Sequence, residues 1–158
     1  MQKQIFGCVE GAQTLYLATF ATIGEPVIYI TRDDLETKQV SQGLSMFAPD
    51  IDVVCMPAWD CLPYDRLSPH GDITGERIST LSKLTANEIL YKKCIILLTI
   101  NSFLQKIPPK SFFLNASLKL FKGADYNLNE ISSFLQDCGF NRTNTVREYG
   151  EFAIRGDI

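Results

Sequence analysis

Hydrophobic positions in the first two-thirds of the chain alternate between short apolar runs and longer stretches with helical spacing. The apolar runs, which favour buried strands, are residues 27–30, 51–56 and 94–100. The stretches with helical spacing are residues 11–23, 31–47 (opened by the capping signal Thr31-Arg32-Asp33-Asp34) and 72–84. This alternation predicts an α/β domain over residues 1 to about 108, with a parallel sheet and helices on both of its faces.

The pattern changes after the Pro108-Pro109 pair. Leu118 and Leu120 alternate with polar residues and predict a half-exposed strand. A helix is predicted from the Asn127 cap to Cys138, with Ile131, Phe134, Leu135 and Cys138 inward and Gly139 after its end. Residues 146–149 and 152–155 predict two strands of a hairpin around Gly150. A small α+β domain is therefore expected to begin near residue 115, and an unpaired edge near residue 158 indicates a fragment of a longer polypeptide.

Residues 57–71, called the signature loop below, carry three prolines and no clear period, which is typical of a structured loop. Trp59 and Tyr64 have two interpretations. They could stack on nucleic-acid bases beside Arg66, or they could pin the loop to the domain core.

Composition narrows the class of protein. The chain of 158 residues is 46% hydrophobic and 21% charged, which is normal for a compact fold. Its net charge of −3 argues against a strongly basic surface that grips DNA. We expect a cytoplasmic protein without a membrane span, because no apolar run is long enough, no signal peptide is evident and the five cysteines are scattered.

Candidate chemistry is sparse. A phosphate loop needs glycines, a lysine and a hydroxyl, and the nearest match offers only Gly11 and Thr14, with no Gly-Lys pair anywhere. We therefore expect no ATP or magnesium site here. His70 is the sole histidine and could be a general base or the cap of the following helix, and it has no metal-ligand spacing around it. No nucleophile elbow occurs, so no catalytic residue is expected.

The signature loop and the following helix also carry a specific motif. Its members, in order, are Trp59, Asp60, Leu62, Pro63, Tyr64, Asp65, Ser68, Pro69, His70, Arg77, Ser79, Thr80 and Leu81. This series resembles the amino-terminal region of the transcription-repair coupling factor (Mfd) family. Residues 148–157 resemble a further segment of that family, and also a run in the related excinuclease protein UvrB.

The resemblance implies that residues 1–108 form a degenerate helicase-like domain, related to UvrB, that has lost its ATP site. It implies that residues 115–158 begin a domain that binds the excinuclease protein UvrA. The parent would be an ATP- and magnesium-dependent translocase that removes stalled RNA polymerase from double-stranded DNA at lesions.

Arg155 is the one partner-binding residue that the resemblance identifies. Its guanidinium would contact a carboxylate of UvrA, whereas the alternative is a solvated surface arginine. Three hypotheses follow: a recruiting module, a nucleotide- or DNA-binding helicase fragment, and an autoinhibitory or structural element that packs on the motor domains of its parent.

Overall fold

The fold was obtained as a computed structural model. It describes residues 6–9, 11–23, 25–62, 64, 66–86 and 92–156. Pro63 and Asp65 of the signature motif, and Asp157 of the segment 148–157, lie outside the described residues.

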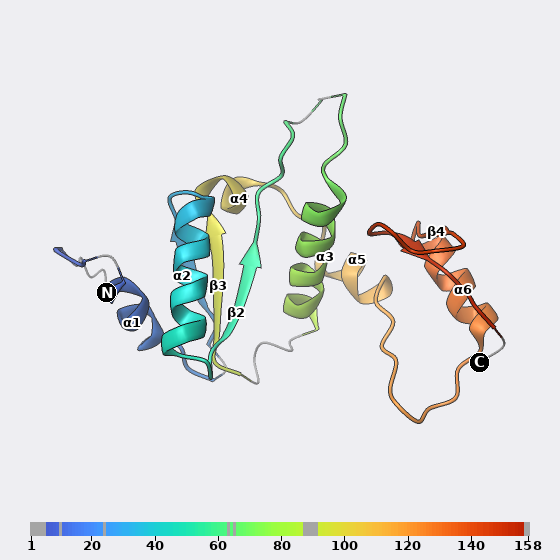
Figure 1. Cartoon of the computed structure of the whole chain (residues 1–158), viewed down its shortest axis with the longest axis horizontal. Coiled ribbons are helices and arrows are strands. Elements are labelled where there is room, and N and C mark those ends of the chain that lie inside the picture. Colours follow the sequence, from blue (N-terminus) through green and yellow to red (C-terminus); the bar gives the residue numbers. More distant parts are fainter. Residues whose placement is uncertain are drawn as a thin grey trace.

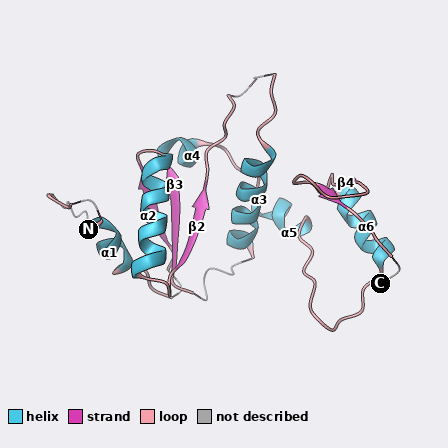
Figure 2. Ribbon diagram, in the orientation of Figure 1, coloured by secondary structure: helices cyan, strands magenta, loops and turns pink. Residues whose placement is uncertain are grey.

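A parallel sheet of three strands forms the centre of the chain (Figures 1 and 2). Its strands are β1 (Val27–Thr31), β2 (Asp52–Met56) and β3 (Cys94–Thr99), in the order β1-β3-β2. Ile96 at the middle of β3 is paired with Ile28 on one side and with Val54 on the other. The prediction of an α/β domain with a parallel sheet is therefore confirmed. The third strand ends one residue earlier than predicted, because the Thr99 side chain caps the short helix α4 (Ile100–Leu104).

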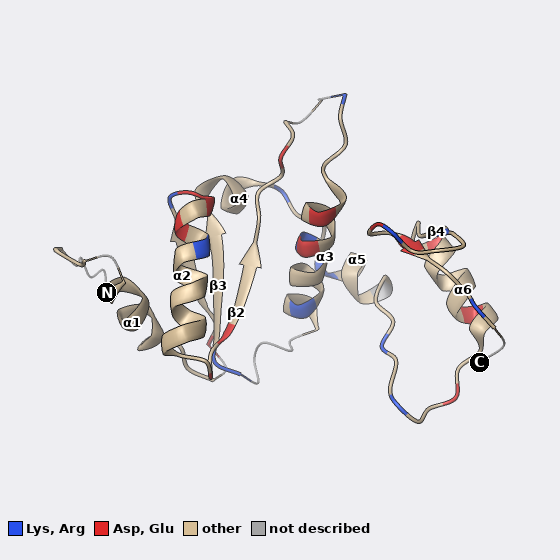
Figure 3. Cartoon of the chain, in the orientation of Figure 1, with Lys and Arg blue, Asp and Glu red and all other residues tan. Residues whose placement is uncertain are grey.

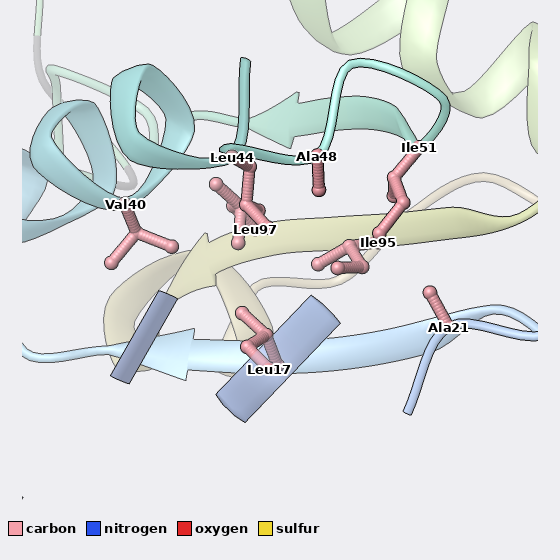
Figure 4. Packing of buried hydrophobic residues seen from close by; sticks show 8 residues of the cluster. All are labelled: Leu17, Ala21, Val40, Leu44, Ala48, Ile51, Ile95 and Leu97. Atoms are coloured by element: carbon pink, nitrogen blue, oxygen red, sulfur yellow. The ribbon is translucent and has the colours of Figure 1, made fainter. Parts of the chain in front are cut away.

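Helices cover both faces of this sheet, as the alternating pattern predicts. All six residues of β3 are buried, and successive side chains point to opposite faces. On one face, α1 (Ala12–Ala18) and α2 (Asp34–Phe47) pack on Ile95 and Leu97 (Figure 4). On the other face, α3 (Gly71–Thr85) and α5 (Lys110–Asn115) pack on Ile96 and Leu98 through Leu81 and Phe113.

The ends of the helices follow local chemistry where a polar side chain is available. Asp33 begins α2 because its carboxylate accepts a hydrogen bond from the Glu36 amide at 2.8 Å. A helix start at this point is confirmed, but the capping box over residues 31–34 is wrong, because Thr31 belongs to β1 and the cap is Asp33. The first helix, predicted to reach residue 23, ends at Ala18. Ile23 instead forms a β-bridge with Lys93, so a tertiary pairing overrides the helical spacing there.

Two predictions for the C-terminal part are wrong. Residues 118–120 are not in a strand. The whole segment between α5 and α6, residues 116–127, belongs to no helix or strand and is exposed. The predicted hairpin is replaced by two short parallel strands, β4 (Asn141–Arg142) and β5 (Glu151–Phe152). Residues 147–150 form a turn because the Glu151 carboxylate accepts from the amides of Arg147 (2.8 Å) and Glu148 (3.2 Å).

Helix α6 (Leu128–Asp137) is confirmed with its Asn127 cap, and Gly139 adopts the left-handed conformation at φ 87°. The inward face is only partly as predicted, because Cys138 is exposed. Below, α6, β4, β5 and their connections (residues 128–156) are called the C-terminal unit. Within the described ranges, no helix is both long enough and apolar enough to cross a membrane.

Candidate functional site

Arg77 is the buried centre of the signature motif. The residue lies in α3 with 2% of its surface exposed, and its Nη1 donates to the Pro57 carbonyl and to the Ser102 hydroxyl at 3.3 Å. The Ser102 hydroxyl also donates to the Pro57 carbonyl at 3.3 Å. One guanidinium therefore joins α3, the end of β2 and α4.

The indole of Trp59 covers this guanidinium. The guanidinium carbon of Arg77 lies 4.4 Å from the ring centroid, and the Trp59 amide donates to the Gln105 side chain at 3.0 Å. Burial lowers the pKa of Arg77, because the charged form loses hydration. The buried Nε has no hydrogen-bond partner among the described residues, so the ring face and the two oxygen acceptors stabilise the charge.

Asp60 and His70 hold the two ends of the signature loop together. Both carboxylate oxygens of Asp60 lie 3.3 Å from the His70 amide nitrogen, which donates to them. The His70 Nδ1 accepts from the Asp72 amide at 3.3 Å, so the histidine caps α3. The interpretation of His70 as a helix cap is confirmed, although the predicted helix start at Asp72 moves by one residue. No group of three metal-binding side chains occurs in the described part of the chain.

The tip of the loop is presented to solvent. Leu62, Tyr64 and Leu67 are all strongly exposed, and Tyr64 has the left-handed φ of 76°. The interpretation that aromatic residues pin the loop is therefore confirmed for Trp59 and wrong for Tyr64. Ser68 is exposed as well, while Pro69 is half-buried.

The structure thus brings four signature residues together at the base of the loop, namely Trp59, Asp60, His70 and Arg77. Sequence reasoning missed their partners Ser102 and Gln105, since nothing in the sequence around α4 distinguishes these two residues from ordinary polar positions.

Of the nearest match to a phosphate loop, Thr14 is used for helix packing, whereas Gly11 is exposed. Gly11 precedes α1 at φ 93°. Thr14 is 4% exposed, and a Cβ placed on Gly43 of α2 would lie 2.9 Å from its Cγ2 and Oγ1. The hydroxyl therefore faces α2 at a point where the two helices approach closely.

Arg155 follows β5 in an exposed position, not in a hairpin strand as predicted. Its Nη2 donates to the Asn144 carbonyl at 3.2 Å and to the Thr145 hydroxyl at 2.9 Å. These two bonds order the side chain, and no acidic side chain within the described ranges forms an ion pair with it. Charges of both signs are interspersed along α2, α3 and the C-terminal unit (Figure 3).

Comparison with known proteins gives a consistent set of relatives. The chain is 35% identical over 131 residues to the transcription-repair-coupling factor of Rickettsia bellii, with 83% of this chain covered. It is 32% identical over 157 residues to that of Haemophilus influenzae and 29% identical over 161 residues to that of Escherichia coli, with 99% of this chain covered in each case. The chain spans only 11–13% of the length of these relatives. No family model matches it.

Proposed function

This chain belongs to the transcription-repair-coupling factor family as an amino-terminal segment, and we propose that it works there as a non-catalytic module that recruits the excinuclease protein UvrA. The observation that carries the proposal is the exposed and ordered guanidinium of Arg155. Two hydrogen bonds fix its orientation before any partner arrives. A preordered planar fork of donors loses little conformational entropy when it binds a carboxylate.

The signature motif supports contact as the mode of action. The side chains with reactive chemistry, His70, Asp60 and Arg77, are engaged in the bonds that shape the loop. The hydroxyl of Thr14 likewise lies against Gly43 of α2. The described residues therefore offer a rigid framework and exposed surfaces, which suits a recruiting role.

The same framework fits a degenerate helicase-like domain related to UvrB. The strand order β1-β3-β2 with helices on both faces is compatible with such a layered fold. In this proposal the parent protein carries ATP and magnesium on a separate motor, removes stalled RNA polymerase from double-stranded DNA and hands the lesion to repair enzymes. A cytoplasmic location accords with the five free cysteines.

A titration of UvrA tests the proposal. Wild-type chain, Arg155→Ala and the matched variant Arg142→Ala, which removes an exposed arginine of β4, are compared by isothermal titration calorimetry. We expect Arg155→Ala to weaken binding about 10- to 100-fold, because a hydrogen bond to a charged group contributes about 1.5–3 kcal/mol. Arg142→Ala should bind as wild type does. Equal affinities for all three proteins would remove Arg155 from the interface.

A structural or autoinhibitory role is the second candidate, and one observation favours it. Ile28 and Ile30 of β1 are 55% and 42% exposed, although they flank the buried Ile96 and Leu98 on the same sheet face. Exposed apolar surface of this kind is typical of a face that packs on another part of a larger protein. Under this alternative, the chain added in trans lowers ATP turnover by a parent that lacks its amino terminus, and an Ile28→Arg variant does not.

A further inference from the structure

We infer that the ring of Tyr149, seated on Gly75 of α3, is the contact that fixes the orientation of the C-terminal unit, and with it Arg155, on the α/β domain. A Cβ added to Gly75 would lie 2.6 Å from Cδ1, 2.9 Å from Cε1 and 3.1 Å from Cγ of Tyr149. These distances mean that one edge of the ring, from Cγ to Cε1, lies close to the bare backbone of the helix, where a larger residue would displace it, while 66% of the Tyr149 surface stays exposed.

Tyr149 reaches this position because its segment forms a turn and not a strand. Gly150 has φ 81°, and the Glu151 carboxylate accepts hydrogen bonds from the amides of Arg147 and Glu148 within the turn. The turn lifts Tyr149 away from the β4–β5 pair and toward the first turns of α3. The dark red loop that approaches α3 in Figure 1 is this turn.

The polypeptide that joins the two parts does not by itself orient them. Residues 116–127 are exposed throughout and belong to no helix or strand, and the beginning of this segment is held to α3 through a hydrogen bond of 3.1 Å between the hydroxyls of Ser117 and Ser82. A connection of this kind leaves relative motion free unless packed side chains oppose it. Tyr149 supplies such packing, and a cleft of about 670 Å³ between the start of α3 and residues 146–151 lies beside it.

The docking of Tyr149 has a direct consequence for Arg155. The two residues lie six positions apart on either side of β5, which pairs with β4 over two residues. The Arg155 guanidinium is in turn bonded to Asn144 and Thr145 of the same unit. Tyr149 is therefore a positioning residue: when its ring leaves Gly75, the binding arginine loses its fixed direction relative to the α/β domain.

Two pairs of variants of the full chain test this inference. Gly75→Ala places a methyl group against the ring, whereas Gly71→Ala, in the same helix, places one at an ordinary distance of 3.9 Å from the Tyr149 Cβ. Tyr149→Ala removes the ring, whereas Tyr149→Phe retains it. The measurement is ¹⁵N relaxation, from which separate rotational correlation times are obtained for β3 and for α6.

We expect β3 and α6 to share one correlation time in wild type, Gly71→Ala and Tyr149→Phe. In Gly75→Ala and Tyr149→Ala the value for α6 falls below that for β3, and combining these two changes has no further effect. Common tumbling in every variant would overturn the inference, and so would separate tumbling in the wild-type chain. Because Tyr149→Ala leaves α3 unchanged, a folding failure of Gly75→Ala still leaves the question decided.

The link to partner binding rests on the proposed function, and the same variants test it separately. If the Tyr149 ring leaves Gly75 in these variants, and about a tenth to a third of the molecules still hold Arg155 in the orientation that binds UvrA, the affinity for UvrA falls about three- to tenfold in Gly75→Ala and Tyr149→Ala. Loss of common tumbling without any binding by the wild-type chain would leave the docking contact established and refute the recruiting role. Loss of common tumbling with unchanged affinity would refute the positioning of Arg155.

Discussion

Replacement of Arg77 tests whether the signature motif is an internal support of the fold. The residue joins three elements through its hydrogen bonds to Pro57 and Ser102 and its contact with the Trp59 ring. We expect Arg77→Ala to lower the free energy of unfolding, and Arg77→Met to lower it less.

The magnitude follows from opposing terms. Hydrogen bonds from a charged donor contribute about 1.5–3 kcal/mol, and a desolvated cation–π contact contributes about 2 kcal/mol. Truncation of a large buried side chain to alanine also leaves a cavity, which costs about 2 kcal/mol or more. Against these losses, removal of the guanidinium relieves a desolvation penalty of several kcal/mol. We expect a net loss of about 2–4 kcal/mol for Arg77→Ala.

The Arg77→Met variant separates the loss of packing from the relief of the desolvation penalty. Its unbranched side chain fills most of the space beneath Trp59 and leaves no charge or unsatisfied Nε to be buried. The loss for Arg77→Met should therefore be about 0–2 kcal/mol, even though both variants remove the same hydrogen bonds. Arg66→Ala, which removes an exposed arginine from the same loop, serves as the control and should be neutral.

Urea denaturation followed by fluorescence and far-UV circular dichroism gives these values. Trp59 is the sole tryptophan of the sequence, so its emission reports directly on the contact with Arg77. Alanine and methionine variants of equal stability would show that the cavity is unimportant. An Arg77→Ala variant within about 0.5 kcal/mol of wild type would refute the supporting role.

Three further outcomes are expected. Gly43→Ala should lower the free energy of unfolding by about 1–2 kcal/mol in thermal and urea unfolding, because the methyl group would lie 2.9 Å from Thr14, despite alanine's higher helix propensity. The hydrogen bond from the Glu36 amide lowers the pKa of Asp33, so this cap stabilises the fold at pH values above the pKa of the unfolded carboxyl and is lost as the pH falls through the pKa of the folded one. In unfolding measured as a function of pH, Asp33→Ala should therefore reduce the loss of stability at acid pH. Burial raises the pKa of the Cys94 thiol, which is 0% exposed, whereas Cys138 is exposed. Mass spectrometry after alkylation should therefore find Cys138 modified long before Cys94, and equal rates would contradict the buried position of β3.

The sequence predicts those elements whose pattern repeats over several residues. The apolar run 94–99 is long and uninterrupted, so a strand buried on both faces is evident without a structure. The C-terminal strands are two residues each, and their parallel pairing depends on contacts between residues 141–142 and 151–152. A two-residue strand leaves no period to detect, and Gly150 predicts a turn without specifying which strands it connects.

The candidate site shows the same limit. The motif from Trp59 to Arg77 identifies the segment and the family, but Arg77 finds its acceptors 20 and 25 residues away along the chain. Tyr149 meets Gly75 across a still larger separation. Side-chain identity alone cannot predict such partners, because they are selected by how α3 and α4 pack on the sheet.

The hydrogen bonds of His70 connect this geometry to the mode of action. A general base needs a free lone pair that can reach a substrate, and the Nδ1 lone pair of His70 accepts from the first turn of α3. Protonation at Nδ1 would remove that cap and turn the atom into a donor, which faces the Asp72 carboxylate at 3.5 Å. A catalytic cycle that uses this atom would thus remove the cap of α3 each time, and the loss of a cap lowers stability by about 0.5–2 kcal/mol. Catalysis by the Nδ1 of His70 would therefore break the helix cap that this atom supplies, whereas the proposed binding through the exposed Arg155 would leave the base of the loop unchanged.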